Sequence, residues 1–361
     1  MTLDASTLSR RDFIRATSVA ALAMMANKVM GGVQESKAAE PFVPRMPDSD
    51  WSAIRGFNYQ PSYGHTGLEL WQKFDAKIIE KELARGKKYF PKMNALRWWQ
   101  SWDSFLRDPK RYEHDFETSL ELAAKVGCKV IPCLFNRWHD TITDYGGIYL
   151  DHFVPDANWV QRPKMFDAFL QALVGGHKDD PRIIAWDLCN EPYYYEILNK
   201  QIEDFANNET AWLKSLRDRC KELGAQAPIT IGCKTFMPLE TIEPICDLLC
   251  IHPYLFTNAN KTDYEKSLNG NVEFALKSHK PLLVSESCWG SLDDKVRVET
   301  IRYELSQYKK RNIGWLVYVL HHSLVADSHR PEFGPVTEPG NLAFIEADGS
   351  LRPGHSVFNE Y

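Results

Sequence analysis

Two short apolar segments of this chain each lead into a glutamate. Residues 183–192 read IIAWDLCNEP and contain Glu191, and residues 281–287 read PLLVSES and contain Glu286. If both segments are buried parallel strands, their carboxylates emerge at the same end of the sheet. Two carboxylates in that position can cleave a glycosidic bond, one as general acid and base and the other as nucleophile. The sequence therefore predicts a sugar-cleaving enzyme.

Eight apolar runs bounded by turns are interpreted as the strands that position these glutamates. The predicted strands are residues 53–59, 95–101, 129–135, 183–190, 228–233, 248–254, 281–287 and 314–321. Helical patterns lie between them, for example at residues 116–126 and 298–308. Strands that are apolar throughout and alternate with helices indicate a parallel sheet covered on both faces. Eight such units predict an α/β fold, the single-domain (β/α)8 TIM barrel, with its active site at the carboxyl ends of the strands.

Polar and aromatic residues collect at the predicted carboxyl ends of these strands. The candidate substrate-binding residues are Asn58, Arg97, Trp99, Trp138, His139, Asn190, His252, Tyr254, Trp289 and His321. Aromatic side chains pack against the apolar faces of sugar rings, and a few polar groups fix the orientation of a ligand. One strand-end glutamate alone would be weak evidence, because carboxylates also occur in structural networks. The pairing of Glu191 on the fourth strand with Glu286 on the seventh carries the prediction.

These residues resemble the clan A retaining glycoside hydrolases, and most of all the family 5 enzymes of the cellulase and mannanase type. The resemblance covers residues 55–323. It rests on Asn190-Glu191-Pro192 after the fourth strand, Glu286 after the seventh, Arg97 on the second and His252-Pro253-Tyr254 on the sixth.

The resemblance implies a role for each matched residue. Glu191 is expected to be the general acid and base, and Glu286 the nucleophile, with their carboxyl groups roughly 5 Å apart. The charge of Glu286 is expected to raise the pKa of Glu191. Arg97 is expected to pair with Glu286, Tyr254 to donate a hydrogen bond to it, and Asn190 to bond the 2-hydroxyl of the sugar.

The predicted eighth strand departs from the family pattern. Trp315 stands near its beginning, whereas the family places an aromatic platform for the reacting sugar at the carboxyl end. His321 or His322 stands at that end instead, unless Tyr318 or Trp289 supplies the platform. A differently shaped subsite for the reacting sugar is therefore expected, and a straightforward cellulase is not.

Residues 1–40 are expected to lie outside the barrel, which then occupies residues 41–361. Arg10 and Arg11 precede an apolar stretch at residues 16–26, which is the pattern of a twin-arginine export signal. The stretch is too short to span a bilayer stably, so no stable membrane insertion is expected. A periplasmic or extracellular location follows, and the alternative is a basic tail with a disordered linker.

Charge and cysteine content limit the possible partners and cofactors. The net charge of -5 gives no reason to expect nucleic acid or an anionic membrane as partner. Most of the eight cysteines lie in or beside apolar runs, and we expect buried free thiols. No metal-ligand spacing or dinucleotide fingerprint occurs, so no metal and no cofactor are expected. The segment at residues 56–61 is not a phosphate-binding turn, which disfavours a doubly wound sheet and a redox enzyme.

The sequence thus predicts a monomeric, exported, retaining β-glycosidase that acts on a β-linked polysaccharide or oligosaccharide. Two alternatives stay open. One is a barrel that binds glycans without turnover, which the presence of both glutamates disfavours. The other is a transglycosylase, because transfer and hydrolysis share the glycosyl-enzyme intermediate. The long segment at residues 137–159 is expected to shape the cleft and so to decide between exo and endo action.

Overall fold

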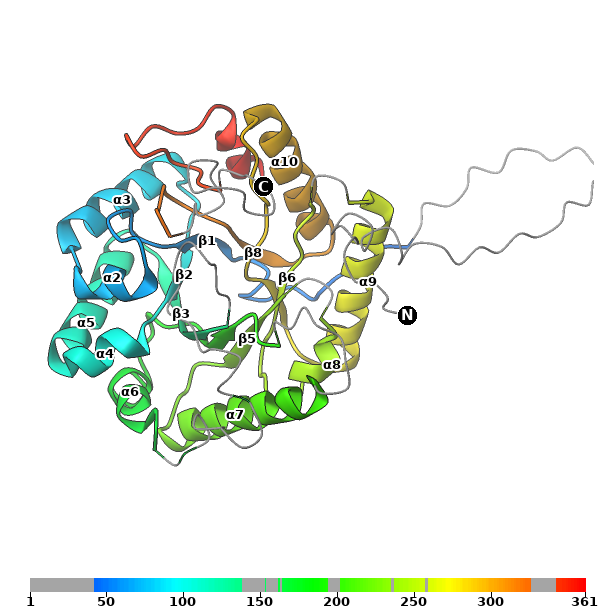
Figure 1. The fold of residues 1–361 in the computed structure, drawn as a ribbon. Coiled ribbons are helices and arrows are strands. Elements are labelled where there is room, and N and C mark those ends of the chain that lie inside the picture. The colour runs from blue at the N-terminus through cyan, green and yellow to red at the C-terminus, as the bar shows by residue number, and fades with distance from the viewer. Residues whose placement is uncertain are drawn as a thin grey trace, which may run out of the picture. The chain divides into compact units, whose positions relative to one another are not determined.

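Eight parallel strands form a closed barrel in which each strand pairs with its neighbours in the sequence (Figure 1). The computed structural model describes residues 42–137, 153, 162, 164–193, 202–234, 237–256, 259–325 and 342–361. The strands are β1 (Arg55–Tyr59), β2 (Ala95–Trp99), β3 (Lys129–Asn136), β4 (Trp186–Asn190), β5 (Ile229–Lys234), β6 (Leu249–His252), β7 (Leu282–Val284) and β8 (Gly314–Val317). Pairing of β8 with β1 closes the barrel. The predicted single-domain TIM barrel is confirmed.

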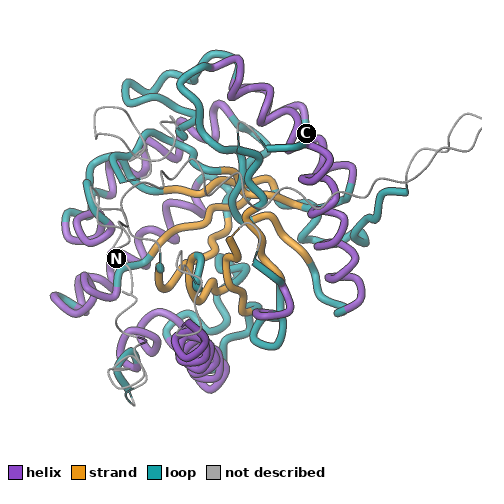
Figure 2. Tube along the Cα trace, turned by 45° about the vertical axis from the view of Figure 1, so that its right-hand side comes forward, coloured by secondary structure: helices purple, strands orange, loops and turns teal. Residues whose placement is uncertain are grey.

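Helices surround this barrel, and Figure 2 shows the strands enclosed by them. They are α2 (Gly67–Gln72), α3 (Ala76–Tyr89), α4 (Trp102–Arg107), α5 (Pro109–Lys125), α6 (Asp167–Leu170), η3 (Gln171–Gly175), α7 (Ile202–Glu222), α8 (Leu239–Ile242), α9 (Lys261–Lys277), α10 (Asp294–Lys310) and η5 (His355–Glu360). The helical patterns predicted at residues 116–126 and 298–308 fall in α5 and α10. Each helix begins with a capping aspartate, Asp108 for α5 and Asp293 for α10. The aspartate side chain accepts hydrogen bonds from backbone N–H groups of the first turn.

Several strands are shorter than the apolar runs that predict them. Ile183 precedes β4 and makes only an isolated bridge to Val130. β6 stops at its junction with Pro253, which has no N–H group to continue the ladder. Beyond β8, the N–H group of Tyr318 donates to the carbonyl of Ser287 at 3.0 Å, in the loop after β7. Apolar runs therefore mark buried chain, of which the ladder occupies only a part.

The barrel interior changes from apolar to polar along its axis. A buried cluster fills one layer and comprises Ala95, Ile131, Ala185, Leu248, Cys250, Leu283 and Leu316. Nearer the carboxyl ends lie Arg97, Asp187 and His252, all fully buried. Gly232 makes room for them, because a Cβ atom there would lie 2.7 Å from Arg97 Nη2 and 2.8 Å from His252 Nε2. The absence of a side chain at Gly232 on β5 thus permits a charged layer inside the barrel.

Buried free thiols were predicted for most of the cysteines, and in the structure all eight are buried and free. Burial raises the pKa of the Cys128, Cys220 and Cys250 thiols to about 12, so these thiols stay protonated at neutral pH. They act as small apolar side chains. Among the described residues, no helix has the length and apolar character needed to cross a bilayer. The predicted export signal lies outside the described residues.

Candidate active site

β4 and β7 bring two glutamates to the same end of the barrel. Glu191 directly follows β4, and Glu286 lies two residues beyond the end of β7. One carboxylate oxygen of each glutamate and a ring nitrogen of His252 all lie within 4.8 Å of one another. The Glu286 side chain is 6% exposed and that of Glu191 is 12% exposed. This limit on the distance between the two carboxylate oxygens is compatible with the roughly 5 Å at which the second carboxylate can attack a sugar directly, without an intervening water.

Arg97 on β2 lies at the centre of a buried polar network. Its guanidinium forms ion pairs with Asp187, at 2.7 Å, and with Glu286. It also donates to the side-chain oxygens of Asn58, at 3.1 Å, and Asn190, at 2.8 Å. Burial alone would lower the pKa of Arg97, but the charges of Asp187 and Glu286 raise it well above its usual value. A permanent positive charge is therefore fixed against one oxygen of Glu286.

Tyr254 and His252 contact the second oxygen of Glu286 and one oxygen of Glu191. The Tyr254 hydroxyl donates to Glu286 Oε2 at 2.8 Å, so both oxygens of Glu286 have a partner. His252 Nδ1 lies 2.7 Å from Glu191 Oε1 and 3.6 Å from Glu286 Oε2. Burial, together with the charge of Arg97, lowers the pKa of His252 to about 4. His252 is therefore neutral near pH 7, and it orients Glu191 without adding a charge.

Glu191 has the ionisation expected of an acid catalyst. Burial raises its pKa to about 7, and the charges of Lys234 and Arg97 oppose this rise only in part. The charge of Glu286 was expected to raise this pKa. Desolvation by burial is instead the main cause. A group with a pKa near 7 can hold a proton at neutral pH and release it during a reaction.

Two asparagines predicted to bind substrate are engaged with the protein. Asn58 is fully buried, and its amide donates to the Ser285 carbonyl at 2.8 Å while its oxygen accepts from Arg97. It supports Arg97 from within the barrel. Asn190 accepts from Arg97 and donates to Asn136 at 3.0 Å. Because an amide nitrogen carries two hydrogens, this bond leaves Asn190 able to donate to a sugar hydroxyl.

Aromatic side chains line the site beside Glu286. Trp99, Tyr254 and Tyr318 belong to one buried cluster, against which the half-buried Trp289 packs. The ring centroids of Tyr254 and Trp289 are 5.4 Å apart, and those of Trp99 and Tyr318 are 5.9 Å apart. Tyr318 and Trp289, the two residues left open as the sugar platform, therefore both lie in this aromatic wall.

His321 lies elsewhere, and its predicted position at the sugar subsite is wrong. Its side chain is buried against α3, with Nε2 3.2 Å from Arg85 and Nδ1 3.7 Å from Glu82. β8 ends at Val317, so the alternation of a strand does not continue to His321. Trp138 and His139, the two other predicted binding residues, lie outside the described residues.

Three buried carboxylates of the site region were missed by the sequence analysis. Asp187 on β4 fixes Arg97, and its Oδ1 accepts from the N–H group of Gly232 at 3.0 Å. Glu209 on α7 and Glu304 on α10 are fully buried and bind the loops that follow β4 and β7. Asp187 could have been found as the one charged residue within an apolar strand. Glu304 follows Ile301 by three residues, on the helix face expected to be buried.

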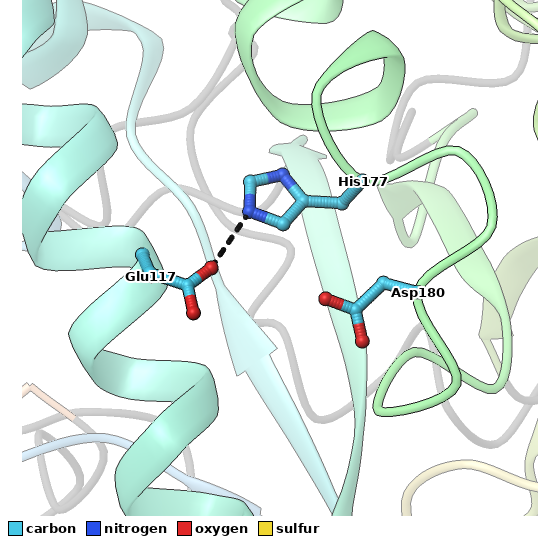
Figure 3. A group of neighbouring side chains, drawn as sticks. All are labelled: Glu117, His177 and Asp180. Carbon is cyan, nitrogen blue, oxygen red and sulfur yellow. Dashed lines mark hydrogen bonds and ion pairs between the residues drawn. The ribbon is translucent and has the colours of Figure 1, made fainter.

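A second cluster, Glu117, His177 and Asp180, also groups metal-ligating side chains (Figure 3). Arg182 pairs with both of its carboxylates, with Nη1 2.7 Å from Glu117 Oε1 and Nε 3.0 Å from Asp180 Oδ1. Hydrogen bonds from Arg182 lower the pKa of both carboxyl groups. We interpret this cluster as a tie between α5 and the segment that precedes β4.

Comparisons with known sequences find a partial match to mannosidases. No family model matches the chain. A probable mannan endo-1,4-β-mannosidase F from Aspergillus flavus is 30% identical over 129 residues, which are 34% of this chain and 27% of that protein. The corresponding protein from Aspergillus oryzae matches to the same extent. The match thus spans about a quarter of the length of these relatives.

Comparisons of the fold find sugar-cleaving barrels. An exo-β-1,4-mannosidase from Opitutaceae bacterium strain TAV5 has a TM-score of 0.63 and 17% identity, over 88% of this chain and 58% of that chain. A GH5_18 protein from Streptomyces cattleya, solved with GlcNAc, has a TM-score of 0.65 and 14% identity, over 88% and 79%. An endo-β-1,4-mannanase from Thermotoga petrophila has a TM-score of 0.57 and 16% identity, over 85% and 76%.

At these identities the structural likeness establishes the fold, a (β/α)8 barrel shared with glycoside hydrolases. The partial sequence match, over 34% of this chain, is to proteins named as mannan endo-1,4-β-mannosidases, and such enzymes also occur among the barrels of similar fold.

Proposed function

We propose that the protein is a retaining β-glycoside hydrolase in which Glu191 is the general acid and base and Glu286 the nucleophile. The observation that carries the proposal is the close carboxylate pair, with oxygens within 4.8 Å. The two groups have different surroundings, as two different roles require. Glu191 has a pKa of about 7, whereas Glu286 is held by Arg97 and Tyr254.

The reaction proceeds in two steps on these groups. Glu286 attacks the anomeric carbon while Glu191 gives its proton to the departing glycosidic oxygen, which leaves a covalent glycosyl-enzyme. Glu191, now ionised, takes a proton from water, and the resulting hydroxide releases the sugar with its configuration retained. When Glu286 loses its charge in the first step, Arg97 keeps Asp187 as a counter-ion. His252 holds Glu191 in place through both proton transfers.

We further propose a β-1,4-mannan or its oligosaccharides as the substrate. The proposal is supported by the sequence match to mannan endo-1,4-β-mannosidases and by fold likeness to a mannosidase and a mannanase. The aromatic wall formed by Trp99, Tyr318 and Trp289 suits the apolar face of a pyranose ring. The segment expected to decide between exo and endo action, residues 137–159, lies mostly outside the described residues.

The test is product release by the purified protein from β-mannan, β-glucan, xylan and galactan, beside Glu191→Gln and Glu286→Gln. Release from β-mannan that both substitutions abolish is the expected result. Binding of a glycan without release from any of them would favour the non-catalytic barrel. Products longer than the starting oligosaccharide, detected by mass spectrometry, would favour transglycosylation.

The pH dependence of turnover is expected to report Glu191. Its pKa of about 7 means that the proton needed for the first step is lost above that pH. We expect kcat/KM for a phenyl glycoside to fall about tenfold per pH unit above neutrality. The Glu191→Gln variant, whose residual rate has no such proton to lose, is expected to show no decline. A decline that persists in the variant would assign it to another group.

We also propose that residues 1–40 direct export by the twin-arginine pathway. The support is the order of Arg10, Arg11 and the apolar stretch at residues 16–26. A reporter fused behind these residues is expected to leave the bacterial cytoplasm only when the twin-arginine translocase is present. Export that persists after Arg10→Lys and Arg11→Lys together would contradict the proposal.

A further inference from the structure

The two βα units that carry the catalytic glutamates share an arrangement two residues beyond each glutamate. Tyr193 follows Glu191 by two residues, and Cys288 follows Glu286 by two residues. Both have a left-handed backbone, with φ of 60° at Tyr193 and 67° at Cys288. This conformation is uncommon for residues other than glycine, so each turn needs support from its surroundings.

A buried glutamate from the next helix provides that support in both units. The N–H group of Tyr193 donates to Glu209 Oε2 on α7 at 3.1 Å. The N–H group of Cys288 donates to Glu304 Oε2 on α10 at 2.7 Å. Both glutamates are fully buried. An N–H group withdrawn from water needs an acceptor, and the residue is fully buried at Cys288 and partly buried at Tyr193, so each bond favours the left-handed turn over its alternatives.

Each helix glutamate also binds the loop that follows the preceding strand. Glu209 Oε1 accepts from Arg137, after β3, at 2.7 Å. Glu304 Oε1 accepts from the N–H group of Leu255, after β6, at 2.7 Å. Leu255 adjoins Tyr254, which itself donates to Glu286. In each unit, one carboxylate therefore fixes two adjacent loops of the site relative to each other.

We propose that Glu209 and Glu304 are positioning residues, Glu209 for the acid and base Glu191 and Glu304 for the nucleophile Glu286. The inference rests on the proposed function, since it concerns how the two catalytic carboxylates are aimed. Glutamine substitutions test it, because the amide nitrogen cannot accept a hydrogen bond. In Glu304→Gln, one of the two loop N–H groups loses its acceptor or the side chain must turn away.

Misplacement of the acid and misplacement of the nucleophile should affect kcat/KM differently as the leaving group is changed. A dinitrophenolate departs without a proton, whereas a phenolate needs the proton of Glu191. Glu209→Gln is therefore expected to lower kcat/KM about 10- to 100-fold for a phenyl glycoside and much less for a dinitrophenyl glycoside. Glu304→Gln is expected to lower both by about 10- to 100-fold, because the nucleophile acts on both substrates.

Glu82→Gln on α3 is the matched control. Glu82 is also buried, and it accepts from the Tyr59 hydroxyl at 2.7 Å, but the loop after β1 carries no catalytic carboxylate. We expect Glu82→Gln to leave the ratio of the two rates unchanged, whatever its effect on thermal stability. A purely structural role of Glu209 would likewise leave this ratio as in the wild type and scale both rates with the folded fraction. A purely structural role of Glu304 would leave both rates per folded molecule at the wild-type value. That result for Glu209→Gln would overturn the inference.

Glycine rescue separates positioning from loss of folding. Glycine adopts positive φ without support, so Cys288→Gly is expected to restore part of the kcat/KM per folded molecule that is lost in Glu304→Gln. Tyr193→Gly is expected to do the same for Glu209→Gln. No recovery in either pair would contradict the inference. If the wild type cleaves neither glycoside of any sugar, the proposed function fails; if it cleaves both and the glutamine variants match it, only the positioning inference fails.

Discussion

Glu286→Ala is expected to lower kcat by about 10⁴-fold or more, since removal of the proposed nucleophile eliminates the covalent route. Azide should restore turnover of a dinitrophenyl glycoside. The truncated side chain leaves space beside Arg97 and Tyr254, and azide can attack the anomeric carbon from that side. Because this is a single displacement, the product should be the α-glycosyl azide. Nuclear magnetic resonance of the product identifies the anomer.

The matched variant is Glu191→Ala. It retains Glu286, so it still forms the glycosyl-enzyme from an activated substrate, and azide then attacks from the opposite face. The product should be the β-glycosyl azide. Opposite anomers from the two variants would assign the roles independently of any rate. The same anomer from both would overturn the assignment of acid and nucleophile.

Arg97→Met is expected to reduce the free energy of unfolding by about 3–5 kcal/mol, which is the usual loss when one partner of a buried ion pair is removed. The methionine has similar length but no charge. Asp187 and Glu286 would then lie close together in the barrel without the cation between them. Asn58 and Asn190 would each lose a donor. Chemical denaturation near pH 7, followed by tryptophan fluorescence, measures the change.

Arg111→Met is the control for loss of an arginine as such. Arg111 on α5 is half exposed and lies 3.3 Å from Asp115, so a loss below about 1 kcal/mol is expected. Asp187→Asn added to Arg97→Met should recover part of the stability, because it removes one of the uncompensated charges. A similar loss in both arginine variants would mean that burial of the Arg97 network contributes nothing beyond an ordinary surface pair.

The fold and the main elements of the site were predictable because they follow from local patterns. Apolar runs identified all eight strands, and a strand end fixes where the next side chain must emerge. This is why Glu191, Glu286, Arg97 and Tyr254 come together as the sequence suggests. The resemblance to known enzymes supplied their roles, which the local patterns could not.

Side chains just beyond the strand ends were harder to predict. His321 was assigned to the cleft because the predicted eighth strand ended at residue 321, whereas β8 ends at Val317 and the His321 side chain packs against α3. Asn58 does lie inside the barrel, but its side chain is fully buried and bonded to Arg97 and to the Ser285 carbonyl. Both errors concern where a side chain lies relative to the barrel. That position depends on contacts with distant parts of the chain, which local sequence patterns do not show.

The buried helix glutamates were missed for a related reason. In a helix, a charged residue near the edge of the apolar face usually reaches solvent. Glu209 and Glu304 are instead covered by loops that approach them from other strands. Only the closed barrel brings the N–H groups of Tyr193 and Cys288 to these carboxylates.

The buried free thiols have a practical consequence for production of the protein. Since none of the eight cysteines is paired, the chain needs no oxidant or disulfide isomerase to reach its native state. Recombinant material made in a reducing bacterial cytoplasm should already be correctly folded, and refolding from denaturant should proceed in the presence of dithiothreitol.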